Sequence, residues 1–218
     1  GVISAARLYK MTPKQMLQRG AELFDWAKSV FCFTFAYRAE MPGNIAAYAR
    51  GKDYHVLIRE RLQKGIAWLE EQIPGIRCQS YADNAPFPEV LAAHYSGAGI
   101  LRKNGLVISM PFRDKVLLGE IAVDRVFEET MPAKESLGVC AHCLRCVDAC
   151  PAGAMTLTQT GRRLLDRSRC IASLTQQKGT LTPEQEQILK KSPYIWGCDI
   201  CQNVCPLGTE NSLQLLCD

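Results

Sequence analysis

The chain has no long hydrophobic run, no low-complexity segment and no internal repeat other than two short runs of cysteine. No apolar stretch approaches the ~20 residues that a membrane-spanning helix needs. The first residues, from Gly1, do not form the charged and apolar regions of a secretory signal. These absences predict a cytoplasmic protein with no membrane partner. They also leave disulfide bonds, which need an oxidising compartment, without support.

Cysteine is the residue that the sequence does supply in a pattern. One run has the spacing C-x2-C-x2-C-x3-C-P, a second has C-x2-C-x3-C-P, and one further cysteine lies between them. The eight residues are Cys140, Cys143, Cys146, Cys150, Cys170, Cys198, Cys201 and Cys205. In two-cluster ferredoxins with the first spacing, three thiolates hold one [4Fe–4S] cluster and the fourth binds the other. Two such clusters need eight thiolates, so the pattern predicts two [4Fe–4S] clusters with no ligand missing.

The crossed arrangement of such modules also predicts which thiolates share a cluster. One cluster is expected on Cys140, Cys143, Cys146 and Cys205. The other is expected on Cys150, Cys170, Cys198 and Cys201. Proline follows the last cysteine of each run and ends the short helical turn there.

Paired zinc sites are the main alternative, because C-x2-C is also a zinc-binding spacing. Zinc pairs do not explain three cysteines at three-residue steps followed by a fourth before proline. Cys32 lies apart, in the apolar run from Val30 to Ala36, and is expected to be a small buried hydrophobic residue.

Net charge gives no argument about a partner. The formal charge is +4, and eight thiolates around two cluster cores bring the loaded protein to a formal charge of zero. The length of 218 residues and the 47% hydrophobic composition allow a substantial core.

The front of the chain alternates helical and extended patterns. We expect helices, strands and a hairpin in the following ranges: a helix from Thr12 to about Lys28, a strand Ser29–Tyr37, a long helix Ile45–Gln72 with Ile58, Leu62, Ile66 and Leu69 on one face, a strand Ile76–Ala82, a short helix Pro88–Tyr95, and a hairpin of Leu106–Met110 with Lys115–Phe127 that turns at Phe112–Asp114. The predicted class is α+β. A layered α/β sheet domain over residues 1–135 is expected to precede a ferredoxin-like double [4Fe–4S] domain over residues 136–218.

A ferredoxin needs only the back of this chain, so the front must have another role. Four motifs precede the cysteine runs: Tyr48-Ala49-Arg50-Gly51-Lys52-Asp53-Tyr54-His55, then Asp83-Asn84-Ala85-Pro86 with Glu89, then Gly97-Ala98-Gly99 through Lys103-Asn104, and Leu118-Gly119-Glu120. In that order and spacing they resemble the epoxyqueuosine reductase family of queuosine synthesis. The resemblance runs from roughly Ala27 to Pro206.

The resemblance implies a cobalamin-dependent oxidoreductase that removes an oxygen from epoxyqueuosine in tRNA. Electrons from an external donor of flavodoxin or ferredoxin type would pass through the two clusters to cobalt. The D-x-A-P position here is Asp83, the expected proton donor in a partly desolvated pocket, although the same residues also suit an Asx-turn or a helix cap. The residues expected to line the cofactor are Tyr54, His55, Gly97, Gly99, Lys103 and Asn104.

Two departures from the family pattern are visible. Members typically read G-L-G-W-x-G-K-N, whereas this chain has Ile100 and Arg102 in place of the tryptophan and the last glycine, so the pocket should differ in shape and charge. The chain also ends at Asp218, soon after Cys205, whereas many members continue into helical repeats that engage tRNA. We therefore expect a short form with reduced tRNA recognition.

Other functions remain open on the sequence alone. One is a related reductase that acts on a small substrate other than tRNA. Another is an electron-transfer protein whose front domain docks a partner and binds no cobalamin. A third is an RNA-binding iron–sulfur module, for which binding should weaken steeply with added salt.

Overall fold

The structure is a computed structural model that describes residues 1–37, 43–110, 112–132, 138–161 and 163–208. The elements in chain order are β1 (Val2–Ser4), α1 (Ala5–Met11), α2 (Lys14–Leu17), α3 (Glu22–Trp26), β2 (Ser29–Ala36), the 3-10 turn η1 (Ala47–Ala49), α4 (Tyr54–Gln72), β3 (Cys78–Tyr81), α5 (Glu89–Tyr95), β4 (Ile100–Leu101), β5 (Val107–Ile108), β6 (Val116–Val123), α6 (Gly138–His142), α7 (Arg145–Asp148), β7 (Met155–Leu157), β8 (Arg163–Leu165), α8 (Ile171–Leu174), α9 (Pro183–Lys190) and α10 (Ile200–Asn203).

An antiparallel sheet forms the centre of the front part of the chain. Its strand order is β1-β2-β6-β3, and β2 and β6 pair along their whole length, from Ser29 opposite Val123 to Ala36 opposite Val116. The Ser29–Tyr37 prediction is therefore confirmed to within a residue. β2 lies between β1 and β6 in the sheet. Its side chains are apolar on both faces of the sheet because a hydrophobic core covers each face.

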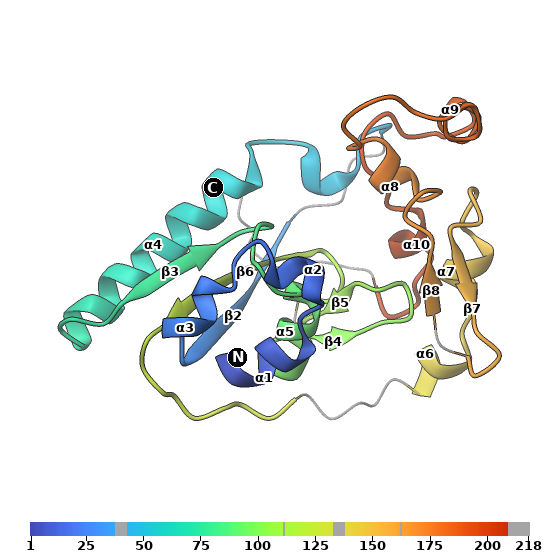
Figure 1. Cartoon of the computed structure of the whole chain (residues 1–218). Coiled ribbons are helices and arrows are strands. Elements are labelled where there is room, and N and C mark those ends of the chain that lie inside the picture. Colours follow the sequence, from blue (N-terminus) through green and yellow to red (C-terminus); the bar gives the residue numbers. More distant parts are fainter. Residues whose placement is uncertain (38–42, 111, 133–137, 162, 209–218) are drawn as a thin grey trace.

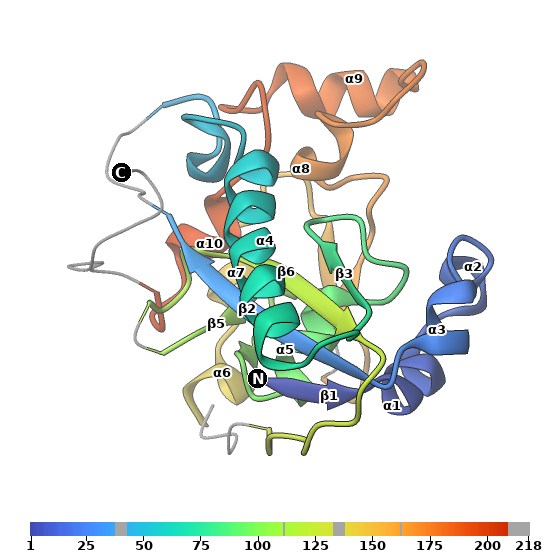
Figure 2. The ribbon, with the colours of Figure 1, turned by 90° about the vertical axis from the view of Figure 1, so that its left-hand side faces the viewer.

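Helices cover both faces of this sheet (Figures 1 and 2). On one face α4 packs with all four predicted residues of its apolar stripe, Ile58, Leu62, Ile66 and Leu69, against β6 and the segment around β3. On the other face α1, α3 and α5 enclose a second core. Cys32 belongs to that second core and is 1% exposed, as predicted. The α+β class with a layered sheet is therefore confirmed.

Several local predictions were wrong in their bounds. The helix expected over Thr12–Lys28 is divided into α2 and α3. The long helix begins at Tyr54 instead of Ile45, because Asp53 caps it by accepting a hydrogen bond from the His55 backbone N–H. β3 and α5 fall inside their predicted ranges. β1 and α1 were not predicted.

The predicted hairpin was wrong in its pairing. β5 pairs with β4, through Ile100 opposite Ile108, whereas β6 pairs with β2 and β3. A single antiparallel bridge between Ser109 and Arg113 is what remains of the expected turn. Pairing of β6 with distant strands buries both of its faces, which a local hairpin does not do.

The cysteine-bearing segments, which run from α6 to α10, lie together on one side of the sheet (Figure 1). Hydrogen bonds join the two parts directly: the Asp199 carboxylate accepts from the Ala47 N–H at 2.7 Å, and the Tyr37 hydroxyl donates to Gln202 at 3.2 Å. Lys115 donates to the side chains of Gln202 and Asn203. The boundary predicted between residues 135 and 136 lies outside the described residues. No helix in the described ranges combines the length and the apolar character needed to span a membrane.

Candidate active site and cluster sites

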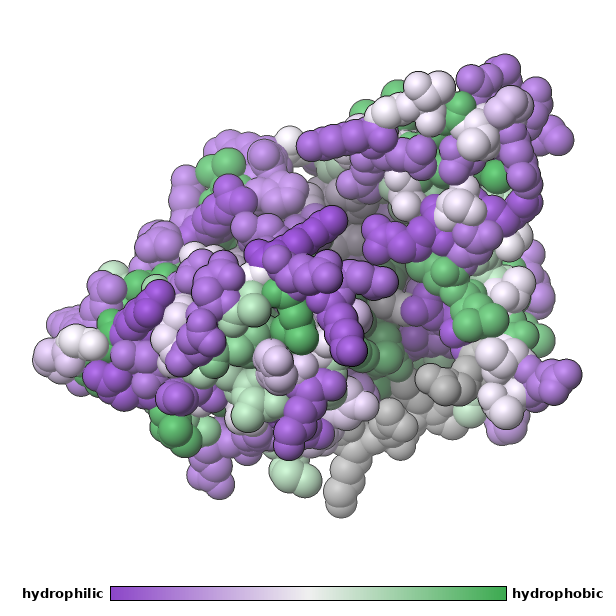
Figure 3. Space-filling model, in the orientation of Figure 1, coloured by the Kyte–Doolittle hydropathy of each residue, from purple (hydrophilic) through white to green (hydrophobic). Residues whose placement is uncertain are grey.

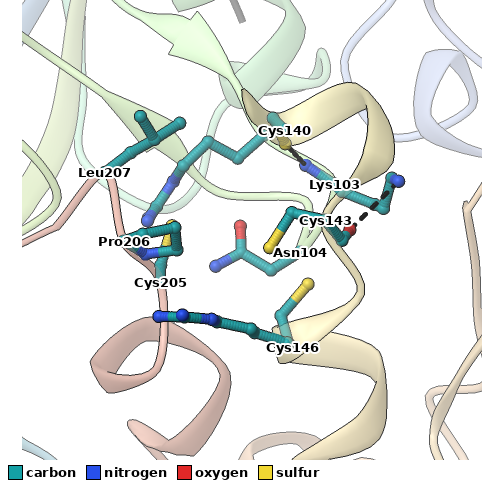
Figure 4. Close-up of a pocket in the computed structure, with 10 residues that line it drawn as sticks. Lys103, Asn104, Cys140, Cys143, Cys146, Cys205, Pro206 and Leu207 are labelled. Carbon is teal, nitrogen blue, oxygen red and sulfur yellow. Dashed lines mark hydrogen bonds between the residues drawn. The ribbon is translucent and has the colours of Figure 1, made fainter. Parts of the chain in front are cut away.

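Four of the predicted cluster ligands gather around one small cavity. Cys140, Cys143, Cys146 and Cys205 all line it, the first three from α6, α7 and the turn between them. Figure 4 shows their sulfurs around a common space, with Asn104 and Pro206 beside them. Two short helices joined by a tight turn bring three sulfurs spaced three residues apart to one side. The grouping is the one expected for the first cluster.

Lys103, in the front part of the chain, forms hydrogen bonds with the segment that lines this cavity. Its backbone N–H donates to the Cys140 Sγ at 3.3 Å, and its ammonium donates to the Cys143 carbonyl oxygen at 3.1 Å (Figure 4). The ammonium also donates to the Ala141 carbonyl oxygen at 2.9 Å. Asn104 donates to the Cys201 carbonyl at 3.3 Å. The predicted cofactor residues Lys103 and Asn104 therefore lie against the cysteine runs.

The other four thiols lie close enough to influence one another. Burial raises the pKa of the Cys198 thiol to about 11, and the neighbouring Cys170 and Cys150 raise it further. Burial likewise raises the pKa of Cys201 to about 12, with Cys198 and Cys170 adding to the effect. These mutual effects place the thiols of the second predicted group near one another.

The state and spacing of the eight cysteines favour four-iron clusters over single metal ions. All eight candidate ligands are free thiols. In the same ranges no three Cys, His, Asp or Glu side chains are close enough together to hold a single metal ion. A four-iron cube holds its thiolates further apart than one zinc ion does.

A larger pocket of about 400 Å³ opens between the front sheet and the cysteine-bearing segments. Figure 3 shows the molecular surface hollowed between these two parts. The pocket is lined by apolar, aromatic and polar side chains in comparable measure: Tyr37, Tyr48, Tyr54, Asp83, Glu89, Val90, Leu106, Val107, Val116, Leu117, Leu118, Arg167, Ala172, Gln176, Cys198, Asp199 and Gln202. A candidate proton donor and a candidate cluster ligand thus line the same pocket.

Asp83 is held at this pocket by the start of α4. The Tyr54 hydroxyl donates to the Asp83 Oδ2 at 2.9 Å, and the His55 Nε2 lies 3.6 Å from the same oxygen. The Tyr54 and His55 rings stack at 3.9 Å, and Asp53 bonds the His55 Nδ1 at 2.7 Å. Burial first, and then the Asp83 charge, raise the pKa of Tyr54, so its phenol stays protonated and donates.

The turn that carries Asp83 has its own supports. Asp83 has a φ of 61°, a left-handed conformation that aspartate tolerates better than most residues. The Asn84 side chain accepts from the Ala82 N–H at 3.0 Å, and Glu89 accepts from the Ala85 N–H at 2.9 Å. Asn84 and Glu89 therefore stabilise the turn, and the Asp83 carboxylate faces the pocket. Its side chain is 63% exposed, more than the partly desolvated site that we expected.

A partly buried carboxyl, Glu89, and a fully buried one, Glu120, are close enough to Asp83 to feel its charge. Burial raises the pKa of Glu89 to about 7, and the Asp83 charge adds to that effect. Glu120, on β6, is fully buried, and neither carboxylate oxygen has a hydrogen-bond partner in the described part of the chain. Burial, and then the charges of Glu89 and Asp83, raise its pKa well above the usual range. The sequence motifs contained both residues but gave no reason to assign them a role.

The remaining predicted residues lie away from the pocket. Gly97 and Gly99 belong to the turn between α5 and β4, and neither is among the pocket's lining residues. A Cβ at Gly99 would stand 3.0 Å from the Ile108 carbonyl, so close packing on β5 explains this glycine. Sequence reasoning missed Tyr48 and Asp199 at the pocket. Their positions depend on contacts between the two parts of the chain that no local pattern signals.

Comparisons with known proteins agree with this geometry. Residues 139–208 match a model described as "4Fe-4S double cluster binding domain", and residues 18–84 match one described as "Epoxyqueuosine reductase QueG, DUF1730". A Synechocystis epoxyqueuosine reductase is 31% identical, over 93% of this chain and 70% of its own length. The chain belongs to the epoxyqueuosine reductase family. Its back part is a double [4Fe–4S] cluster domain.

Other members of the family are similarly related. The epoxyqueuosine reductase of Bacillus anthracis is 36% identical over 90% of this chain and 51% of its own length. The solved structure of the Streptococcus thermophilus epoxyqueuosine reductase superposes with a TM-score of 0.78 at 26% identity, over 99% of this chain and 64% of that one. The chain spans about half the length of the Bacillus relatives, which are matched over 51 to 52% of their sequences.

A further solved structure contains an epoxyqueuosine reductase with an epoxyqueuosine-modified tRNA-Tyr stem loop. It superposes with a TM-score of 0.75 at 26% identity, over 95% of this chain and 60% of that one. A Bacillus subtilis epoxyqueuosine reductase, with a TM-score of 0.74 at 26% identity, has the catalytic loop of an aspartate swung out of the active site.

Proposed function

We propose that the chain is a cobalamin-dependent reductase that removes the epoxide oxygen of epoxyqueuosine. Converting an epoxide to an alkene takes two electrons and two protons, and the oxygen leaves as water. The site must therefore deliver electrons and protons to one place. When bound, two [4Fe–4S] clusters and cobalamin supply one-electron carriers that end at a cobalt centre.

The observation that carries this proposal is the shared pocket of Asp83 and Cys198. Cys198 belongs to the second predicted group of thiolates, with Cys150, Cys170 and Cys201. A cluster on that group would border the pocket, and a cluster on Cys140, Cys143, Cys146 and Cys205 would lie one step further from it. We assign the ligands accordingly. An external donor of flavodoxin or ferredoxin type would then meet the first cluster.

The pocket combines apolar and polar walls, as a cofactor with both kinds of surface requires. Aliphatic side chains from β5 and β6 and three tyrosines line it, together with the polar side chains of Asp83, Glu89, Arg167, Gln176, Asp199 and Gln202. Small-molecule and cofactor sites combine apolar walls with polar groups that fix orientation. We propose Tyr54 and Leu117 as cofactor or substrate contacts. The predicted roles of Gly97, Gly99, Lys103 and Asn104 in cobalamin binding stay predictions.

Asp83 would supply one of the two protons to the departing oxygen, and solvent water would supply the other. General acids of this kind contribute typically 10²–10⁴-fold to the rate. Tyr54 holds the carboxyl toward the pocket through its 2.9 Å hydrogen bond, and Glu89 holds the turn. The relative whose aspartate loop swings out of the active site supports a working role for such a loop. The exposed side chain of Asp83 can take a new proton from water after each turnover.

The substrate is proposed from relatives. One of them was solved with an epoxyqueuosine-modified tRNA stem loop. This chain spans about half the length of the Bacillus relatives. The proposal therefore concerns the chemistry at the modified base and not contacts to the rest of a tRNA. We further propose a cytoplasmic location, where thiolate ligands stay reduced.

The test is anaerobic turnover by protein loaded with iron, sulfide and cobalamin and reduced chemically. The substrates compared are an epoxyqueuosine-modified stem loop and the free epoxyqueuosine nucleoside, and mass spectrometry follows the loss of one oxygen. Conversion of either supports the reductase. Conversion of the nucleoside alone assigns a small substrate, and reduced clusters without conversion of either would favour an electron carrier.

A further inference from the structure

Arg102 has a buried guanidinium group without a hydrogen-bond acceptor. Its side chain is 1% exposed, and its Nε, Nη1 and Nη2 atoms have no partner in the described part of the chain. The nearest carboxylate oxygen is the Asp114 Oδ2, 3.8 Å from Nη1, which is too far for a hydrogen bond. The backbone of Arg102 is fully engaged, since its N–H donates to Leu106 and its carbonyl accepts from Gly105.

Such a group needs a partner beyond the side chains described around it. Burying a cation costs several kcal/mol unless opposite charge and hydrogen bonds compensate. Arginine carries five N–H donors in a rigid fork. Asp114 balances part of the charge at 3.8 Å but satisfies none of the donors.

The position of Arg102 identifies the partner. Arg102 lines the small cavity together with Cys140, Cys143, Cys146 and Cys205. Its charge also lowers the pKa of Cys201, a ligand of the second group, so the guanidinium lies near both groups of thiols. Four thiolates around a [4Fe–4S]2+ core carry a net charge of −2, and each sulfur can accept a hydrogen bond.

We propose that Arg102 donates hydrogen bonds to the sulfurs of the first cluster and thereby raises its reduction potential. The proposal rests on the ligand assignment made above. One-electron reduction takes that centre from −2 to −3, and a buried cation stabilises the more negative state more strongly. Hydrogen bonds to the sulfurs act in the same direction. Arg102 thus makes the first cluster easier to reduce than it would be without this cation, which suits a cluster that receives a donor's electron.

Arg145 provides a matched comparison. It lines the same cavity, but it is exposed to solvent. Water and salt screen an exposed charge far more than a buried one. Removing either arginine from the cavity lining changes the formal charge by one unit, but only Arg102 is buried.

The experiment uses the full chain, reconstituted anaerobically with iron and sulfide. Iron content is measured first, and then the midpoint potentials of both clusters by EPR-monitored redox titration. In Arg102→Met we expect the larger fall at one of the two potentials, by about 59 mV or more, a tenfold change in the one-electron equilibrium. Arg145→Met should move either potential by much less. Equal shifts in the two variants, or no shift in Arg102→Met at full iron content, would overturn the proposal.

Arg102→Lys keeps the charge but loses the fork of donors, and it guards against a Met variant that fails to load. We expect it to hold both clusters, with one potential lowered by less than in Arg102→Met. A potential unchanged in Arg102→Lys would contradict the hydrogen-bonding role. A wild-type chain that binds far fewer than eight irons would overturn the ligand assignment itself, whereas eight irons with no effect of Arg102 overturns only this inference.

Discussion

The Tyr54 hydroxyl donates a 2.9 Å hydrogen bond to the Asp83 carboxylate, joining the first turn of α4 to the turn that follows β3. Removing it with Tyr54→Phe should lower kcat roughly ten- to a hundredfold, since a hydrogen bond to a charged group contributes ~1.5–3 kcal/mol. The measurement is steady-state turnover with iron content as a check. Tyr48→Phe is the control, because Tyr48 lines the same pocket but bonds Gln176. Equal losses in both variants would argue against a specific role for Tyr54.

Asp83→Asn should abolish most turnover while leaving the cofactors in place. Asparagine keeps the size and can still accept from Tyr54, but it cannot give up a proton to a departing oxygen. We expect a loss of 10²-fold or more in kcat, with unchanged iron content and unchanged cluster EPR signals. Asp53→Asn is the comparison, because Asp53 contacts His55 from the other side and does not line the pocket. Near-normal turnover in Asp83→Asn would remove Asp83 from the chemistry.

Glu89 should make stability depend on pH. Its pKa is raised to about 7 in the folded chain from the ordinary 4.5, chiefly by burial and also by Asp83, while His55 opposes this. Between these values the folded state keeps a proton that the unfolded state has lost, so stability falls as pH rises from about 4.5 to about 7. Glu89→Gln should remove this slope and keep the acceptor for Ala85. The measurement is denaturant unfolding of the wild type and of Glu89→Gln between pH about 4.5 and about 7, which gives the difference in their free energies of unfolding at each pH.

Glu129→Gln serves as the control for that experiment. Hydrogen bonds from Ser4 and Arg7 lower the pKa of Glu129, so its contribution to stability is lost only as pH falls below 4.5. The free energy of unfolding of Glu129→Gln, relative to the wild type, should therefore stay constant from pH about 4.5 to about 7. Over the same pH range the corresponding value for Glu89→Gln should change. A flat Glu89→Gln difference would show that Glu89 ionises normally in the folded protein.

Gly119 should tolerate no side chain where α4 crosses β6. A Cβ there would stand 2.8 Å from the Ile58 Cγ2 and 3.0 Å from the Phe35 Cε2. Gly119→Ala should lower the free energy of unfolding by ~1–3 kcal/mol through overpacking. Gly65→Ala, on α4 at the same interface, meets only the mobile end of Ile121 at 3.3 Å and gains helix propensity, so it should be neutral or stabilising. Equal effects of the two changes would contradict this packing.

The cluster domain could be predicted from sequence because ligand spacing is a local property. Three cysteines at three-residue steps can reach one cube from a single short segment, and α6, α7 and the turn between them form such a segment. The stripe from Ile58 to Leu69 was equally readable, since a helix on a sheet repeats its apolar residues every three to four positions.

Long-range pairing could not be predicted in the same way. The apolar run of β6 suited a hairpin with the residues before it, but β2 and β3, far away in the chain, are its partners. The start of α4 was misplaced because the pattern from Ile45 continued through η1, and the Asp53 cap was not recognised. Arg102 was expected to alter the pocket. Its place beside the thiols depends on the docking of the two parts of the chain.

The central claim is that one pocket receives electrons from two clusters and holds cobalamin next to Asp83. The most direct measurement is cofactor stoichiometry after anaerobic reconstitution with iron and sulfide, addition of cobalamin and desalting, by iron analysis and EPR. The account predicts close to eight irons per chain, as two [4Fe–4S] clusters require, together with a retained cobalamin signal. Eight irons without retained cobalamin would contradict the reductase and indicate an electron carrier.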